Sequence, residues 1–112
     1  MNISGKLAAL ISLVTITGWF QMAWADTTKA KCELHKHGEV KQNASGRCTF
    51  SQRQGYVDIE LHNGDTYSLS PGNKANHFKD QKGNKVVRHS EGGNSHTYKW
   101  EHKKIIVTFT HN

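Results

Sequence analysis

Hydrophobic and polar residues alternate with a period of two over much of the chain, which is the pattern of half-buried β-strands. The clearest case is residues 56–62, where Val57, Ile59 and Leu61 fall on one face. Asn63-Gly64 follows, and residues 65–70 then resume the alternation. An Asn-Gly pair between two alternating segments is a strong hairpin signal, because both residues tolerate positive φ. The sequence therefore predicts a β-hairpin over residues 56–70.

Turn-forming residues recur every eight to twelve positions and divide the remaining chain into further short strands. The expected strands are residues 39–42, 47–52, 77–81, 85–89, 95–102 and 105–110. The polar stretch Asp26–Lys31 is expected to be a loose lead. No segment after residue 25 keeps a 3.6-residue period long enough for a helix. We therefore expect an all-β domain, a small antiparallel barrel or compact sandwich of seven or eight short strands.

The first 25 residues differ from the rest and predict a signal peptide. A short basic start is followed by the apolar run Leu7–Phe20 and by Ala23-Trp24-Ala25, which fits the small-x-small rule for signal peptidase. Cleavage before Asp26 would leave a single domain, residues 26–112, with no transmembrane segment. We therefore expect a periplasmic or secreted protein, and the sequence leaves its oligomeric state open.

Cys32 and Cys48 are the only cysteines of the chain. In an exported protein the expected state of such a pair is a disulfide. The bridge would enclose a loop of 15 residues, and loop-closure entropy suggests a stabilisation of about 3 kcal/mol. A domain of this size has a small core, so a covalent link between two segments would add usefully to its stability.

Charge indicates the class of partner. The formal net charge is +6, and it becomes +5 when Lys6 leaves with the signal peptide. Eight histidines would add positive charge in acid. A basic surface attracts polyanions, so the expected partner is an anionic polymer, a glycan or an envelope protein. The alternative is that the charge only keeps the protein in solution.

Four residues combine cationic and aromatic character and are the candidate ligand contacts: Arg88, Lys99, Trp100 and Lys103. Lysine next to an exposed aromatic ring suits glycan or base stacking. Two other interpretations stay open. In one, Trp100 packs in the core. In the other, Arg88 forms a structural ion pair with Asp80 or Asp58.

Histidine raises the question of a metal. His35 and His37 stand two residues apart, so on a strand they would share a face and could chelate Zn²⁺ or Cu²⁺. His89, His96 or His102 could complete such a site from neighbouring strands. The alternative is that these are scattered surface histidines and that the protein has no cofactor.

An enzyme is not expected. The chain has no Gly-x-Ser-x-Gly nucleophile elbow and no glycine-rich phosphate loop. Asp58, Asp65 and Asp80 are spread over separate turns and strands, so the pattern indicates no pair of catalytic carboxylates. We assign no catalytic residue and expect a binding protein.

Two resemblances add to this picture. Gly46–Gly55, with Tyr67-x-Leu69-x-Pro71 and Asp80-Gln81-x-Gly83-x-x-Val86-x-Arg88, resembles a group of small exported bacterial β proteins of uncharacterised function. The hairpin from Val57 to Leu69 more weakly resembles the periplasmic C-type lysozyme inhibitors. That resemblance implies a β-barrel and an inhibitor or immunity role against an envelope-degrading enzyme such as lysozyme. In that family the disulfide joins the two ends of the chain, whereas both cysteines here fall early.

Overall fold

The computed structural model describes residues 26–90 and 92–110, so the predicted signal peptide lies outside the described residues. Nine strands and one short 3-10 helix form in this part of the chain, and none of its helices is long or apolar enough to span a membrane. The elements are β1 (Asp26–Lys36), β2 (Glu39–Val40), η1 (Gln42–Ala44), β3 (Gly46–Arg53), β4 (Tyr56–Glu60), β5 (Thr66–Pro71), β6 (His77–Lys79), β7 (Lys85–Ser90), β8 (Ser95–Lys99) and β9 (Lys103–Phe109).

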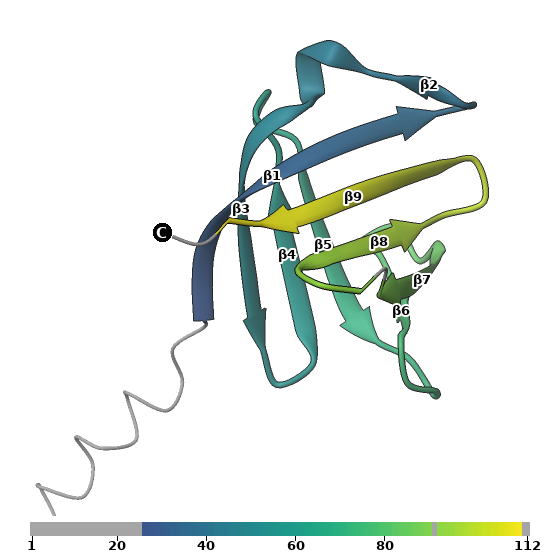
Figure 1. Ribbon diagram of the computed structural model, residues 1–112. Helices are drawn as coiled ribbons and strands as arrows, with labels where there is room; N and C mark the ends of the chain where they lie inside the picture. The colour runs from purple at the N-terminus through teal and green to yellow at the C-terminus, as the bar shows by residue number, and fades with distance from the viewer. Residues whose placement is uncertain (1–25, 91, 111–112) are drawn as a thin grey trace, which may run out of the picture.

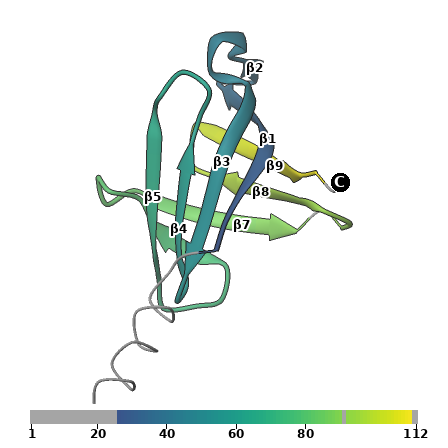
Figure 2. The same ribbon diagram turned by 90° about the vertical axis from the view of Figure 1, so that its left-hand side faces the viewer.

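The strands form one antiparallel sheet that closes on itself. Its order is β2-β1-β3-β4-β5-β6-β7-β8-β9, and β1 also pairs with β9. The result is a closed eight-stranded barrel with the two-residue β2 as an extra strand beside the end of β1. In Figures 1 and 2, β3, β4 and β5 run side by side on one wall, and β7, β8 and β9 cross them steeply on the facing wall. The prediction of an all-β antiparallel fold is confirmed.

The strand β1 closes the barrel by pairing with two neighbours in turn. Its first part pairs with β3, beginning at Asp26 opposite Gln52, and its second part pairs with β9 up to Lys36 opposite Lys103. Figure 1 shows the bend between these two parts. The expectation that Asp26–Lys31 is a loose lead was wrong. Thr27, Lys29 and Lys31 are exposed on the outward face of this strand, and its inward face is lined by the buried residues Ala30, Cys32 and Leu34.

The predicted hairpin over residues 56–70 is confirmed as β4 and β5. Its loop is longer than the Asn-Gly pair alone, because the Leu61 N–H donates to the Asp65 carbonyl (2.8 Å) and the Gly64 N–H to the Leu61 carbonyl (2.9 Å). Only Gly64 of the pair takes positive φ, at 97°. This is the arrangement of a type I turn followed by a glycine bulge, which twists the two strands in the right sense.

The predicted strand 95–102 ends three residues early. Strand β8 stops at Lys99, and the Trp100 N–H donates to the Lys103 carbonyl (2.8 Å), which makes Trp100–Lys103 a tight turn into β9. His102 therefore does not continue the row of Tyr98. The strand ends here because the Trp100 side chain turns inward and covers the end of the core, where it is only 7% exposed.

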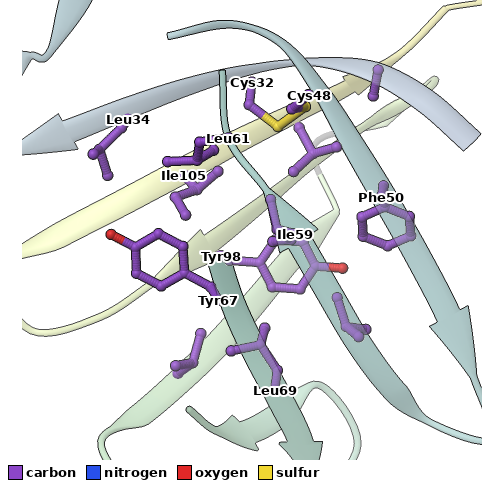
Figure 3. Close-up of a cluster of buried hydrophobic side chains, with 14 of the residues drawn as sticks. Cys32, Leu34, Cys48, Phe50, Ile59, Leu61, Tyr67, Leu69, Tyr98 and Ile105 are labelled. Carbon is purple, nitrogen blue, oxygen red and sulfur yellow. A yellow bond between two sulfur atoms is a disulfide. The ribbon is translucent and has the colours of Figure 1, made fainter. Parts of the chain in front are cut away.

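The interior of the barrel is filled by the inward residues of every long strand. Figure 3 shows Leu34, Ile59, Leu69, Tyr98 and Ile105 converging from different strands. The predicted disulfide is present and links β1 to β3, with Cys32 and Cys48 both buried.

Because neighbouring strands are antiparallel, the turns that connect them are divided between the two ends of the barrel. The β1–β2, β4–β5, β6–β7 and β8–β9 turns lie at one end, which we call the β8–β9 end. The β3–β4, β5–β6 and β7–β8 connections lie at the other, which we call the β7–β8 end.

Candidate functional site

The described surface has an open concavity of about 960 Å³. It lies where the β8–β9 turn meets the end of β1 and the outward face of β7. We call it the basic concave surface. It is lined by Lys36, His37, Asn84, Lys85, Val87, His89, Lys99, Trp100, Glu101, His102 and Lys103.

The charge on this surface is strongly one-sided. It carries four lysines and three histidines, but Glu101 is its only carboxylate. The Glu101 carboxylate lies 3.8 Å from His102 Nε2. Among the described residues, none of the four lysines is within ion-pair distance of a carboxylate. Cations that outnumber the carboxylates of a hollow produce a focused positive potential, which concentrates anions.

Lys103 is the most deeply placed of these cations. Its Nζ lies 4.7 Å from the centre of the Tyr67 ring and 5.2 Å from that of Trp100, and the two rings meet edge to face. Burial lowers the pKa of the Lys103 ammonium, and the charge of nearby Lys36 lowers it further. The ring faces favour the cation, but its partial desolvation costs free energy, which a bound anion would recover.

A buried carboxylate holds the floor of this surface in place. The Trp100 Nε1–H donates to Asp80 Oδ2 (2.9 Å), and the backbone N–H groups of Lys82 and Asn84 donate to Asp80 Oδ1 (3.0 and 2.8 Å). Burial alone would raise the pKa of the Asp80 carboxyl, but these hydrogen bonds outweigh it and hold the pKa below its ordinary value. One charged group therefore fixes both the indole ring and the β6–β7 turn.

The two turns that border the surface are also tied together. The His37 N–H donates to the His102 carbonyl (3.0 Å), and the two imidazole rings are stacked with centroids 5.7 Å apart. A smaller hollow of about 300 Å³ adjoins these rings and extends the surface toward His35 and Lys104. The surface thus continues around the end of the barrel.

The structure brings together three of the four predicted ligand contacts. Lys99 and Lys103 both present their ammonium groups at the basic concave surface. Trp100 lies beneath them, and its indole is buried. The alternative that Trp100 is a core residue is therefore the better description, and its part in the site is to support Lys103.

Arg88 lies apart from the other three, toward the β7–β8 end. Its Nε–H donates to Asn76 Oδ1 (3.0 Å), and its Cζ lies 5.1 Å from the centre of the Phe78 ring. The suggested ion pair of Arg88 with Asp80 or Asp58 does not form. Asp80 faces Trp100 at the other end of the barrel, and Asp58 is exposed on β4.

The two histidines considered as metal ligands line the same small hollow, but only His35 lies on a strand. His35 lies on β1 and contacts Glu33 (Nε2 to Oε1, 3.1 Å), whereas His37 is in the following turn with a positive φ of 51°. That turn ends the alternation on which the predicted pairing depends. In the described residues, no group of three or more His, Cys, Asp or Glu side chains is placed to hold a metal ion.

Sequence reasoning missed the part of the site that β7 supplies. Lys85, Val87 and His89 alternate with the inward Val86 and Arg88, and the register sets Val87 opposite Lys99. This alternation is visible in the sequence. What the sequence did not show is that the same outward face meets Lys36 and His37, because that contact depends on barrel closure by β1 and β9.

In comparisons with family models, with curated proteins and with solved structures, no match to this chain was found.

Proposed function

We propose that this protein is an exported, non-enzymatic binding protein whose basic concave surface recognises an anionic polymer. The observation that supports this most directly is the set of four lysines around one hollow with no carboxylate paired to any of them among the described residues. Surface cations that serve only solubility are usually interspersed with acidic residues.

Recognition by charge fits this surface better than recognition by ring stacking. Trp100 and Tyr67 are both buried, and Lys103 covers their rings. A neutral sugar would therefore find no open aromatic platform in this hollow. We accordingly place the anionic polymers, including acidic glycans, ahead of neutral glycans as partners.

The proposed location is the periplasm or the medium outside the cell. It rests on the predicted signal peptide. The Cys32–Cys48 disulfide is compatible with an oxidising compartment of this kind.

Binding to heparin, used as a defined anionic polymer, tests the proposal. We expect saturable binding that weakens steeply between 50 and 300 mM NaCl, because released counterions and screening both oppose it at high salt. The Lys85→Gln/Lys99→Gln variant should bind about tenfold to thirtyfold more weakly at low salt, at about 1 kcal/mol for each lysine. The readout is the dissociation constant from titration calorimetry.

The matched control is Lys29→Gln/Lys31→Gln, which removes two exposed cations from β1 outside this surface. It should weaken binding by no more than a fewfold. Equal losses in both variants would mean that net charge, and not the basic concave surface, attracts the polymer, and would overturn the proposal. Inhibition of lysozyme by micromolar protein without heparin binding would replace the proposal with the inhibitor role.

A further inference from the structure

Lys103 differs in its surroundings from the exposed lysines of the basic concave surface. It begins β9, and the register sets it directly opposite Lys36 of β1. Side chains opposite one another on neighbouring strands lie about 5 Å apart at Cβ. Lys103 is only partly exposed, and its ammonium lies over the Tyr67 and Trp100 rings, yet it lines the hollow. Its amine is therefore reached from the hollow on one side and packs on aromatic carbon on the other.

The charged groups that act on Lys103 come from three other segments. Partial burial lowers the pKa of its ammonium most, and the positive charge of Lys36 lowers it further. Lys82 of the β6–β7 turn acts in the same direction, whereas Asp80 and Asp65 act against it. Among the described residues, neither carboxylate is within ion-pair distance of the Lys103 ammonium. Lys103 therefore loses its proton more readily than a fully solvated lysine, and the neutral amine that results is a nucleophile.

The same hollow offers cations that hold an anionic group beside this amine. Lys36, Lys85 and Lys99 are exposed and line the hollow together with Lys103. A lysine ammonium binds phosphate as a point charge, and it needs no fixed orientation to do so. The hollow, of about 960 Å³, is in the size range of small-molecule sites. A molecule with both a phosphate and an aldehyde would therefore be held by the exposed lysines with its carbonyl carbon near Lys103.

We propose that Lys103 is a covalent binding site for small phosphorylated aldehydes. The neutral amine of Lys103 adds to the aldehyde carbon, and the carbinolamine that forms loses water to give an imine. The proton that the ammonium releases is regained by the imine nitrogen, so the net reaction joins the ammonium and the aldehyde with loss of water. The reaction needs no oxidant or reductant, and hydrolysis reverses it.

Labelling with pyridoxal 5′-phosphate tests this inference. Borohydride delivers a hydride to the imine carbon and makes the link permanent, so that peptide mass spectrometry locates it. At a limiting amount of reagent and pH 7.5, we expect Lys103 to be labelled about tenfold faster than Lys29 or Lys74, because a lowered pKa leaves more neutral amine. Both comparison lysines are exposed and lie outside the hollow. Equal labelling of the three lysines would overturn the proposal.

Pyridoxal, which carries the same ring and aldehyde without the phosphate, tests the part of the exposed lysines. Because it closes to an internal hemiacetal and reacts more slowly with every amine, the quantity compared is the ratio of labelling at Lys103 to labelling at Lys29. This ratio should fall about threefold to tenfold with pyridoxal, since the exposed lysines then have no phosphate to hold. An equal ratio for the two reagents would show that the hollow does not recognise phosphate and would overturn the proposal.

Two variants separate reaction at Lys103 from the general effect of positive charge. Lys103→Arg keeps the charge but removes the nucleophile, so the protein should lose its fast labelling. Lys36→Gln should slow labelling of Lys103 about threefold to tenfold at pH 7.5 and move its pH profile to higher pH, because the charge that helps to lower the Lys103 pKa is gone. A rate and pH profile at Lys103 that do not change in Lys36→Gln would count against the proposal.

The matched control is Lys29→Arg, which should leave labelling of Lys103 unchanged. If Lys103→Arg does not fold, the distribution of the label over the wild-type lysines still decides the question. This inference uses the surface of the proposed function but does not require a polymeric partner. Preferred labelling of Lys103 in a protein that does not bind heparin would support the covalent site and overturn the proposed function, and heparin binding without preferred labelling would do the reverse.

Discussion

Asp80 shows how much one residue can organise in a small barrel. Its carboxylate is buried and accepts hydrogen bonds from Trp100, from the backbone of Lys82 and from both the backbone and the side chain of Asn84. Hydrogen bonds to a charged acceptor are stronger than neutral ones. The indole that supports Lys103 therefore depends on a single carboxylate from another strand.

Asp80→Ala should lower the free energy of unfolding by about 2–4 kcal/mol, because it leaves the buried Trp100 N–H without an acceptor. Urea unfolding at pH 7 measures this change. Asp58→Ala, at an exposed position on β4, is the control and should cost less than about 0.5 kcal/mol.

Acid should have a related effect through Asp80. The pKa of its carboxyl is lower in the folded state than in the unfolded chain, so its contribution to stability is complete above the ordinary aspartate pKa of about 3.9 and is lost as the pH falls through the folded-state pKa. The free energy of unfolding should therefore fall more steeply below pH 4 in the wild type than in Asp80→Asn. Parallel acid profiles for the two proteins would contradict this assignment.

At the scale of elements, alternation along one strand decides which of its residues line the basic concave surface. On β7, Val86 and Arg88 face the interior, while Lys85, Val87 and His89 face outward. A shift of one residue in the pairing of β7 with β8 would exchange these two sets. The register of this pair therefore places Arg88 and Lys85 on opposite faces of the sheet.

The elements with strong local signals were predictable from the sequence, and those that depend on distant partners were not. The hairpin of β4 and β5 carries alternation and an Asn-Gly turn, and it was predicted within a residue or two. The first part of β1 looks polar by itself, and only pairing with β3 and β9 reveals it as a strand. Lys99 and Lys103 were predicted as ligand contacts from composition, whereas Lys36 joins them only through barrel closure.

Two adjacent isoleucines of β9 test which face of this strand contributes to the free energy of unfolding. Ile105 is fully buried on β9, and its neighbour Ile106 faces outward and is partly exposed. Ile105→Ala should lower the free energy of unfolding by about 2–5 kcal/mol, since it opens a cavity in the core. Ile106→Ala is the matched control and should cost clearly less, and equal losses would contradict the assignment of inward and outward faces.

On the scale of the whole molecule, the two ends of the barrel have different chemistry. The β8–β9 end gathers exposed cations, whereas the β7–β8 end sets one arginine among aromatic rings. In the core between the two ends, Tyr67 and Phe50 lie on either side of Tyr98 (Figure 3).

Acidification should strengthen polyanion binding. Three of the residues that line the basic concave surface are histidines (His37, His89 and His102), and Glu101 is the only carboxylate among the lining residues. Histidine is the side-chain type whose charge changes between neutral and mildly acidic pH. At pH 5.5 the protein should elute from heparin at a higher NaCl concentration than at pH 7.5. The His37→Asn/His102→Gln variant should lose much of this gain.

The control for that experiment is His62→Gln/His77→Gln, which removes two exposed histidines outside the surface. It should keep the gain in acid almost intact. Equal reductions in both variants would indicate that total charge, and not this group of histidines, sets the pH dependence.

The double pairing of β1 also imposes an order on assembly. Hairpins such as β4–β5 and β8–β9 close short loops. The pairing of β1 with β9, which sets Ala30 opposite Phe109, instead joins strands from the two ends of the described sequence. Most of the entropy lost in forming long-range contacts therefore falls on one seam. The β1–β9 pairing should therefore form last during folding and open first in the native state. Transient opening there would admit water to the interior while the hairpins stay intact.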